Sequence, residues 1–254
     1  MFQKERYDQI YNILKERKSA TVQYLQKHLF VSEATVRRDL EAMEQAGALQ
    51  RVWGGAMLPT IDKDIPSFVR DKTNKDKKEK IAEIASHLVP DCASVFIDSS
   101  TTCHHLVPFL AERRQLVIIT SSLQMGQMIA ENTTASLNLL GGNVFEGNIL
   151  SGHAAVAAVR QYYTDLMFFS CSGITAHEGV SSIESRVVEV VQEMMRHSGK
   201  KILLCDSSKV GKHFLWSLAD FDALDYVIMD RVPDDETLVS VLGKKLITDA
   251  EQIK

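Results

Sequence analysis

Two adjacent arginines, Arg37 and Arg38, are the first residues of the chain whose type and setting point to a chemical role. They lie in the run SEATVRRDLEAMEQAG, residues 32–47, which has helical periodicity. At about 100° per residue its apolar positions share one face of a helix: Val36, Leu40 and Met43. Near its N-terminal end the outward face carries the small and polar residues Ala34 and Thr35, with an arginine on each side. Ser32 is the expected N-cap of this helix.

A helix with this outward face suits the major groove of DNA. Small side chains allow close approach, and guanidinium groups bind both base edges and phosphates. The arginine pair alone is more typical of a solvated helix. A preceding short helix that the cluster Ser19-Ala20-Thr21 can cap, and a tight turn at 29–31, add a helix-turn-helix arrangement. Two short strands around Gly54-Gly55 would form a wing, with Arg51 against the DNA backbone. Trp53 would pack at the root of the wing or contact the DNA backbone, and packing is the favoured role.

A second group of candidate residues lies in hydroxyl-rich loops further along the chain. Three loops follow predicted strands, and a fourth segment adds a lysine: Asp98-Ser99-Ser100-Thr101-Thr102, Thr120-Ser121-Ser122, Ser170-Cys171-Ser172-Gly173 and Cys205-Asp206-Ser207-Ser208-Lys209. Such loops converge outside the carboxyl ends of parallel strands. Those that lead into helices offer free N–H groups to an anion such as phosphate. Taken singly, each is more typical of ordinary helix capping, and it is their number in one sheet that makes a ligand site an equal alternative.

The elements that must position these loops alternate between strand and helix. Short apolar runs predict buried strands at 94–98, 116–120, 137–140, 166–170, 201–205 and 225–229. Helical patterns predict helices between them at 79–89, 102–112, 122–131, 152–162 and 183–197. This alternation predicts an α/β fold with a largely parallel, helix-covered sheet. We therefore expect a winged helix-turn-helix domain at 1–58, a charged, proline-containing linker at 59–77, and an α/β effector domain at 78–254.

Charge is distributed unevenly over the 254 residues, whose net charge is −4. Residues 1–80 carry a net charge of +4 and residues 81–254 a net charge of −8, which predicts different partners for the two parts. No apolar run is long enough to span a membrane. The charged N-terminal segment MFQKERYDQIYNIL is unlike a signal peptide, and the four cysteines form no C-x-x-C pair. We expect a cytoplasmic protein with reduced thiols and no membrane partner.

The first segment resembles the N-terminal domain of the DeoR family of bacterial transcriptional repressors. That family's signature places an arginine and two aliphatic residues before a Ser-x-x-Thr-aliphatic-Arg-Arg-Asp-aliphatic block, followed by a spaced glycine and Gly-Gly-Ala. Every position is filled here: Arg6, Ile10, Leu14, Ser32, Thr35, Val36, Arg37, Arg38, Asp39, Leu40, Gly47 and Gly54-Gly55-Ala56. Asp39 is expected to orient a neighbouring arginine rather than to contact DNA.

The rest of the chain resembles the DeoR-type sensor domain, whose fold is similar to ribose-5-phosphate isomerase and glucosamine-6-phosphate deaminase. Its counterparts include the hydroxyl-rich loops, Gly141-Gly142, Ser172-Gly173-Ile174 and an Asp-x-Ser-Lys loop at Asp206–Lys209. The resemblance implies that Ser99 to Thr102 and Lys209 bind phosphate. Ser100 replaces the family's glycine and Ser121 its asparagine. These added side chains would narrow the pocket, and would either favour an effector other than the usual sugar phosphates or weaken binding.

The resemblance to isomerases raises an alternative, an enzyme with an appended DNA-binding domain. An aldose-ketose isomerase needs a carboxylate base, and related isomerases carry paired acids after the second loop. The corresponding run NLLGGNVFEGN holds the single Glu146. We therefore expect no catalysis and no cofactor. Cys103-His104-His105 could suggest a metal, but consecutive helical residues point about 100° apart and no partner has metal-site spacing.

The sequence thus predicts a DNA-binding transcriptional regulator, and specifically a repressor of a carbohydrate catabolic operon. Ser32, Ala34, Thr35, Arg37, Arg38 and Arg51 are the predicted contacts to double-stranded operator DNA. A phosphorylated sugar is the predicted effector. A homodimer or homotetramer is expected, because helix-turn-helix motifs read paired half-sites.

Overall fold

The apolar stripes of the N-terminal segment fold against one another. In the computed structural model, which describes residues 3–17, 19–45, 48–52, 54–57, 67–146 and 148–253, three helices bury these stripes in one core: Ile10, Leu14, Val22, Leu25, Leu29, Val36, Leu40 and Met43. Phe30 ends the second helix in a left-handed conformation (φ 53°) at the expected tight turn. The predicted helix-turn-helix is confirmed.

A small sheet completes this first unit, Met1–Thr73. Its elements are α1 (Gln3–Arg17), β1 (Ser19–Thr21), α2 (Val22–Leu29), α3 (Glu33–Gln45), β2 (Gln50–Val52), β3 (Gly55–Met57) and α4 (Ser67–Lys72). The hairpin β2–β3 is the predicted wing, and β1 pairs with β3. A Cβ on Gly55 would lie 2.2 Å from the Ala20 carbonyl oxygen, so this strand approach requires glycine.

Two sequence expectations differ from the structure in this unit. Residues 19–21 were expected only to cap a helix; the Thr21 Oγ1 does accept the Tyr24 N–H at 3.2 Å, but the segment also forms β1. Helix α4 and the first turn of the next helix fall in the predicted 59–77 linker. The charge run there belongs partly to helices, and Lys77, within the predicted linker, bonds to Ser207 of the second unit to which it belongs. Gly47, Trp53 and residues 58–66 lie outside the described residues.

The second unit, Asn74–Lys254, is built on a parallel sheet of seven strands. Their order is β15-β14-β12-β9-β4-β5-β6, and every neighbouring pair is parallel. The strands are β4 (Ser94–Ile97), β5 (Val117–Thr120), β6 (Ser136–Leu139), β9 (Thr164–Ser170), β12 (Ser198–Cys205), β14 (Tyr226–Met229) and β15 (Leu246–Ile247). The six predicted strands and the parallel fold are confirmed.

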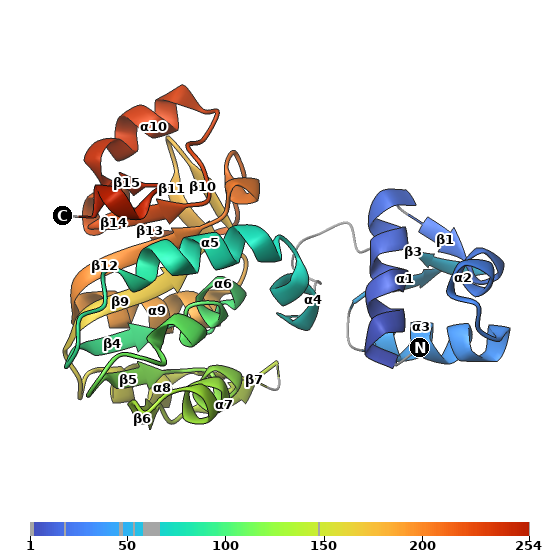
Figure 1. Cartoon of the computed structure of the whole chain (residues 1–254), viewed down its shortest axis with the longest axis horizontal. Coiled ribbons are helices and arrows are strands. Elements are labelled where there is room, and N and C mark those ends of the chain that lie inside the picture. Colours follow the sequence, from blue (N-terminus) through green and yellow to red (C-terminus); the bar gives the residue numbers. More distant parts are fainter. Residues whose placement is uncertain are drawn as a thin grey trace. The chain divides into compact units, whose positions relative to one another are not determined.

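Helices cover both faces of this sheet (Figure 1). Alternate strand residues enter two separate cores: Val95 and Ile97 pack on one side, and Phe96 on the other. One core is closed by α5 (Lys75–Ser86), α6 (Thr101–His104), the 3₁₀ turn η2 (Val107–Leu110) and α7 (Leu123–Asn132). The other is closed by α8 (His153–Val159), α9 (Ser185–Arg196) and α10 (Glu236–Leu242).

Two smaller antiparallel pieces were not predicted. They are the hairpin of β7 (Asn143–Phe145) and β8 (Ile149–Ser151), and a sheet of β10 (Gly173–Thr175), β11 (Gly179–Ser182) and β13 (Trp216–Ala219). These strands lack the continuous apolar runs by which the strands of the parallel sheet were predicted. The predicted helix 102–112 is also interrupted, because Pro108 lies in η2.

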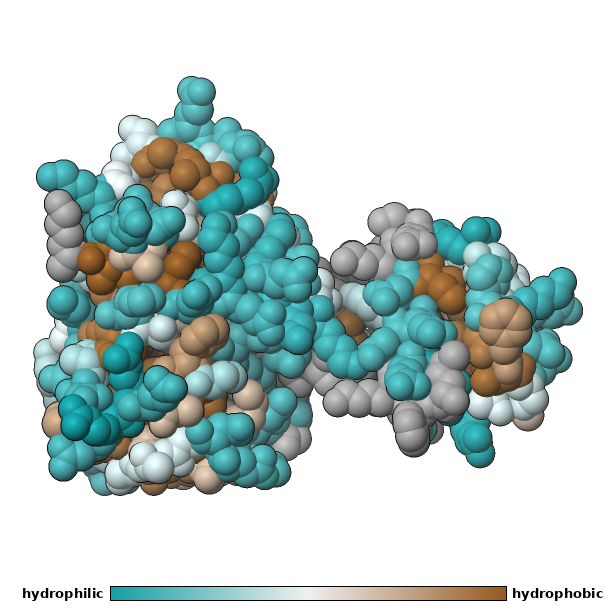
Figure 2. Space-filling model, viewed as in Figure 1, coloured by the Kyte–Doolittle hydropathy of each residue, from teal (hydrophilic) through white to brown (hydrophobic). Residues whose placement is uncertain are grey.

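Hydrophilic side chains dominate the visible face of the second unit, with hydrophobic residues in small patches between them (Figure 2). Scattered apolar residues are normal on soluble surfaces. Within the described ranges, no helix is both long and apolar enough to cross a membrane.

Candidate DNA-binding surface and effector site

Helix α3 presents the predicted DNA contacts to solvent because its apolar stripe is buried. The Ser32 Oγ accepts the Thr35 N–H at 3.2 Å and lies 2.8 Å from the Thr35 hydroxyl oxygen. Ser32 is therefore the N-cap of α3, as predicted. Ala34, Arg37 and Arg38 are exposed. The structure thus brings five of the six predicted contacts onto one helix surface.

The two arginines of α3 differ in their partners. The Arg37 guanidinium donates to Glu33 Oε1 from Nε at 3.0 Å and from Nη2 at 2.6 Å. Both side chains are about half exposed, so this pair contributes little stability and Arg37 can exchange Glu33 for a phosphate. Arg38 is exposed, and no described residue forms an ion pair with it. Arg38 is therefore the arginine that is already available for a new partner.

Asp39 fixes the direction of α3. Its fully buried carboxylate accepts from Arg6 of α1, with Nε–Oδ2 at 2.6 Å and Nη2–Oδ1 at 3.0 Å. This hydrogen bond raises the pKa of Arg6. Asp39 does form an ion pair, but with an arginine 33 residues away rather than with a neighbour. In the wing, the Arg51 side chain is exposed while its backbone N–H donates to Glu44 Oε1 at 2.9 Å.

The strand order of the second unit defines where a ligand would bind. From β4 the chain continues to β5 and β6 on one side, whereas β9 and the later strands lie on the other side. The chain therefore leaves β4 and β9 in opposite directions, and the strand order reverses between these two strands. Ligands of open parallel sheets bind at such a reversal, outside the carboxyl ends of the strands. Asp98 follows β4, and Ser170 ends β9. The Ser170 N–H donates to Asp98 Oδ2 at 3.1 Å, so these two loop starts meet.

Asp98 organises the first loop. Its other oxygen, Oδ1, accepts from the Ser100 N–H at 2.9 Å and from the Ser100 hydroxyl at 2.5 Å. Burial raises the pKa of Asp98 despite these hydrogen bonds. The Ser100 Oγ also accepts the Cys103 N–H at 3.3 Å and so caps α6. The side chain that replaces the family's glycine is thus bonded to the protein itself.

Lys78 is a candidate ligand that the sequence reasoning missed. Its side chain is 4% exposed, and its Nζ donates to Thr101 Oγ1 at 3.0 Å. Thr102 Oγ1, in the same loop, accepts from the Ser170 hydroxyl at 3.3 Å. Lys78, the first residue of the predicted effector domain, was not singled out because it lies in a charge run. The missed signal is its spacing to Ile81 and Ala85, which places it on the buried face of α5.

The second loop is buried, and its hydroxyls bond to backbone N–H groups of the loop itself and of the following helix. Thr120 Oγ1 accepts the Ser122 N–H at 3.2 Å, and Ser122 Oγ accepts the Met125 N–H at 3.2 Å to cap α7. Ser121 is 2% exposed. Gly141 and Gly142 are exposed, and Gly142 has φ 145°, where a Cβ would lie 2.8 Å from the Ser151 carbonyl oxygen.

The fourth loop is held by the first turn of α5. The Asn74 side-chain amide donates to Asp206 Oδ1 at 3.2 Å and to Ser208 Oγ at 3.0 Å. Lys77 Nζ donates to Ser207 Oγ at 2.8 Å. Helix α5 therefore reaches both the loop after β12 and, through Lys78, the loop after β4. Neither Asn74 nor Lys77 was predicted.

The third loop is bonded to the end of the neighbouring strand β11. Ser172 accepts the Ile183 N–H at 3.3 Å and donates its own N–H to the Ser181 carbonyl at 3.0 Å. A Cβ on Gly173 would lie 2.3 Å from the Lys212 carbonyl oxygen, so Gly173 allows close packing of β10. Lys209 lies half-buried in the 3₁₀ turn η3 (Ser207–Lys209).

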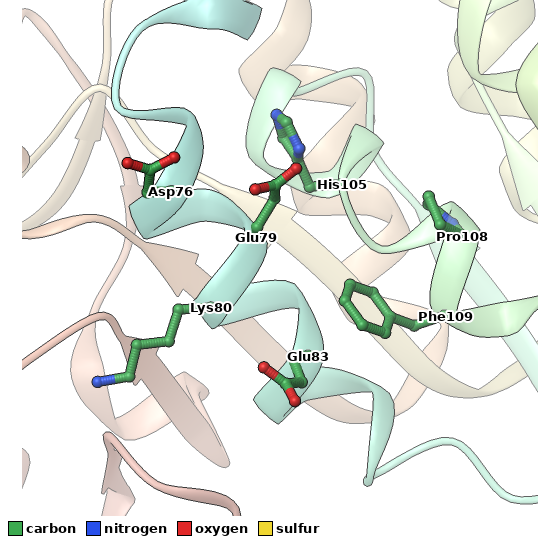
Figure 3. A pocket seen from close by; sticks show the side chains of 7 residues that line it. All are labelled: Asp76, Glu79, Lys80, Glu83, His105, Pro108 and Phe109. Carbon is green, nitrogen blue, oxygen red and sulfur yellow. The ribbon is translucent and has the colours of Figure 1, made fainter.

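A separate hollow of about 430 Å³ lies between α5 and the segment 105–109 (Figure 3). Its charged lining residues are Asp76, Glu79, Lys80 and Glu83, and Lys80 Nζ is bonded to the Asp230 carbonyl at 2.7 Å. Three carboxylates beside one engaged lysine would repel a phosphate. The hollow is therefore a poor candidate for the effector site. Nowhere in the described ranges does a group of three or more His, Cys, Asp or Glu residues suit a metal ion.

Comparison with known proteins assigns both units. A model of the DeoR-like helix-turn-helix domain matches residues 6–62, and a model of the DeoR C-terminal sensor domain matches residues 73–231. The chain belongs to the DeoR family. This DeoR-family chain is a DNA-binding transcriptional regulator, with a recognition helix in its first unit and a sensor domain in its second.

Named relatives align with the DeoR-family chain over most of its length. It is 30% identical to the transcriptional repressor GlcR of Bacillus subtilis, over 92% of this chain and 91% of that protein. It is 30% identical to the regulator GolR of Listeria innocua, over 91% and 92%. It is 26% identical to the glycerol-3-phosphate regulon repressor of Escherichia coli, over 92% and 93%.

Solved structures show weaker similarity. A ribose-5-phosphate isomerase in complex with phospho-erythronic acid overlaps 54% of this chain and 54% of its own, with 13% identity and a TM-score of 0.41. A translation initiation factor eIF-2B from Pyrococcus horikoshii overlaps 89% and 82%, with 9% identity and a TM-score of 0.46. Similarity at this level carries no inference about activity.

Proposed function

We propose that this regulator represses a carbohydrate catabolic operon in the cytoplasm, and that a phosphorylated sugar bound to its second unit releases it from operator DNA. The observation that carries the effector assignment is the meeting of Asp98, Ser170 and the loop bonded to buried Lys78 at the β4–β9 switch point. A buried ammonium group beside hydroxyls and helix N-termini suits a phosphate. A relative named as the glycerol-3-phosphate regulon repressor supports a small phosphorylated metabolite as the effector.

The DNA contacts that we propose are those of α3 and the wing. Arg38 would bind a base edge or a phosphate, Arg37 a phosphate, and the hydroxyls of Ser32 and Thr35 the DNA backbone. Arg51 would contact the backbone from the wing. Binding as a homodimer or homotetramer follows from the need to read two half-sites.

We propose a sensor rather than an enzyme, because the carboxylates near the site are already engaged. Both oxygens of Asp98 accept hydrogen bonds, and Asp206 Oδ1 accepts from Ser208 and Asn74. Glu184 caps α9 through the Arg186 N–H at 3.2 Å. A general base must instead reach a substrate proton. Turnover of a sugar phosphate by the purified chain would reject this part of the proposal.

The test measures binding of the full chain to the DNA fragment upstream of its own gene. Fluorescence anisotropy gives the affinity at several salt concentrations. We expect affinity to fall steeply with salt, because phosphate contacts release counterions. A panel of phosphorylated sugars should contain one that lowers affinity by about 5- to 150-fold, while its unphosphorylated form has no effect. Absence of any salt-sensitive affinity, with or without the panel, would refute the proposed function.

A further inference from the structure

Two free thiols meet at the carboxyl ends of adjacent strands. Ser170 of β9 is in register with Leu204 of β12, and the next residue on each strand is a cysteine. The sulfurs of Cys171 and Cys205 lie 3.7 Å apart, unbonded. Both side chains pack in the same hydrophobic core, so they share one face of the sheet. The sulfurs are therefore in direct contact.

The backbone spacing allows these sulfurs to bond. Adjacent strands lie about 4.7–4.9 Å apart, within the range of about 4.4–6.8 Å that Cα atoms of a disulfide span. A bond of about 2.05 Å requires the sulfurs to approach by roughly 1.7 Å. Side-chain rotation supplies movement on this scale without displacing either strand.

We propose that Cys171 and Cys205 are a redox modification site, which forms a reversible intramolecular disulfide on reaction with a low-molecular-weight disulfide such as oxidised glutathione. The Cys171 thiolate attacks one sulfur of the oxidant, its proton having gone to solvent, and glutathione leaves as a thiolate. The Cys205 thiolate then attacks the Cys171 sulfur of the mixed disulfide and displaces the second glutathione. Two protein thiols are oxidised, and one glutathione disulfide is reduced to two thiols.

The order of attack follows from accessibility. Cys171 is partly exposed, whereas Cys205 is fully buried. The contact with Cys171 and burial raise the pKa of Cys205 well above its ordinary value. Cys171 therefore reacts first and Cys205 resolves. Closure should become faster as the pH rises, because the thiolate fraction of Cys205 increases.

The bond would join two loops that border the candidate effector site. One is the segment after β9, which begins at Ser170, and the other is the loop Asp206–Lys209. Fixing their separation should weaken the binding of a phosphorylated sugar. This consequence rests on the proposed function, whereas formation of the disulfide does not.

The experiment uses the full chain with Cys92→Ser, which removes the exposed thiol that would react independently. After incubation with oxidised glutathione, remaining thiols are alkylated under denaturing conditions and the peptides are identified by mass spectrometry. We expect a linked peptide pair that contains Cys171 and Cys205, an intact mass lower by two hydrogens, and reversal by dithiothreitol. Cys103, buried elsewhere, should stay alkylatable.

Two variants make the result decisive. Cys171→Ser in the same background should give no link and no adduct. Cys205→Ala should accumulate the glutathione adduct on Cys171, because the resolving thiol is gone. Two results would overturn the proposal. One is a stable glutathione adduct on Cys171 in the parent chain. The other is that both thiols remain free after about four hours of incubation at pH values up to about 8.5, the ordinary thiol pKa. Should Cys205→Ala fail to fold, comparison of the parent with Cys171→Ser still decides it.

Discussion

At the scale of single residues, neighbours in sequence can have different tasks. Arg37, Arg38 and Asp39 are consecutive, yet Arg37 pairs with Glu33 on the surface, Arg38 has no ion-pair partner among the described residues, and Asp39 is buried against Arg6. The helical wheel explains this division, since successive side chains point about 100° apart. The sequence therefore identified the outward-facing arginines, but it could not show that Glu33 partly occupies Arg37.

Arg38→Ala should weaken operator binding more than Arg37→Ala. Loss of a specific base contact costs about 1–3 kcal/mol, whereas Arg37 already shares its charge with Glu33. Arg38→Lys is the matched control, because it keeps the charge and loses the bidentate geometry. It should preserve the salt dependence of binding while lowering discrimination between operator and unrelated DNA, both measured by anisotropy. Equal affinity of Arg38→Ala and the parent chain on the operator would contradict the assignment.

At the scale of elements, sequence patterns predicted what hydrophobic burial controls. The six strands and the helix-turn-helix emerged because their apolar residues repeat with the period of the structure that buries them. The start of α5 did not, because its residues are charged and their burial depends on distant loops. Buried Lys78 donates to Thr101, and Asn74 takes a left-handed conformation (φ 57°) while its amide bonds to Asp206. Partners so far apart in sequence leave no local pattern.

Glu193 joins α9 to the end of α8, and replacing it measures how much this contact stabilises the protein. Its buried carboxylate accepts from Arg160, at the end of α8, with Nε–Oε1 at 2.6 Å, and from Arg196 of α9, with Nη1–Oε2 at 2.6 Å. The hydrogen bond from Arg160 is the main reason that the pKa of Glu193 is lowered. Glu193→Gln should lower the free energy of unfolding at pH 7 by about 1 kcal/mol, because both arginines are largely exposed.

The pH dependence of this difference follows from the lowered pKa. A carboxylate with a depressed folded-state pKa stabilises the protein above its ordinary pKa of about 4.3, and this contribution is lost as the pH falls through the folded-state pKa. The difference between parent and variant should therefore be constant near neutrality and vanish in acid. Urea titrations across this range measure it. Glu189→Gln, on an exposed position of the same helix, should behave as the parent at every pH; a Glu193→Gln effect that persists in acid would argue against the ion pairs.

At the scale of the whole molecule, two units with opposite charge balance share one chain. The net charge is +2 over residues 1–73 and −6 over residues 74–254, which fits a first unit that contacts DNA and a second that does not. Each unit has its own buried core, so each can respond separately to a ligand. Regulation must then pass from the second unit to the first.

Each unit holds one of the two tryptophans, Trp53 in Met1–Thr73 and Trp216 in Asn74–Lys254, so unfolding can be followed unit by unit. In Trp53→Phe, fluorescence reports the second unit, and in Trp216→Phe, the first. The phosphorylated sugar found by the anisotropy screen, at about 100 times its Kd, should stabilise the second unit by about 2.7 kcal/mol. That corresponds to a rise of about 5–10 °C in the melting temperature reported by Trp216. The melting temperature reported by Trp53 should not change.

Adding Lys78→Met should abolish the rise, because the buried ammonium that would meet the phosphate is gone. Equal shifts from both tryptophans would mean that the units melt together, and a rise that survives Lys78→Met would place the phosphate elsewhere.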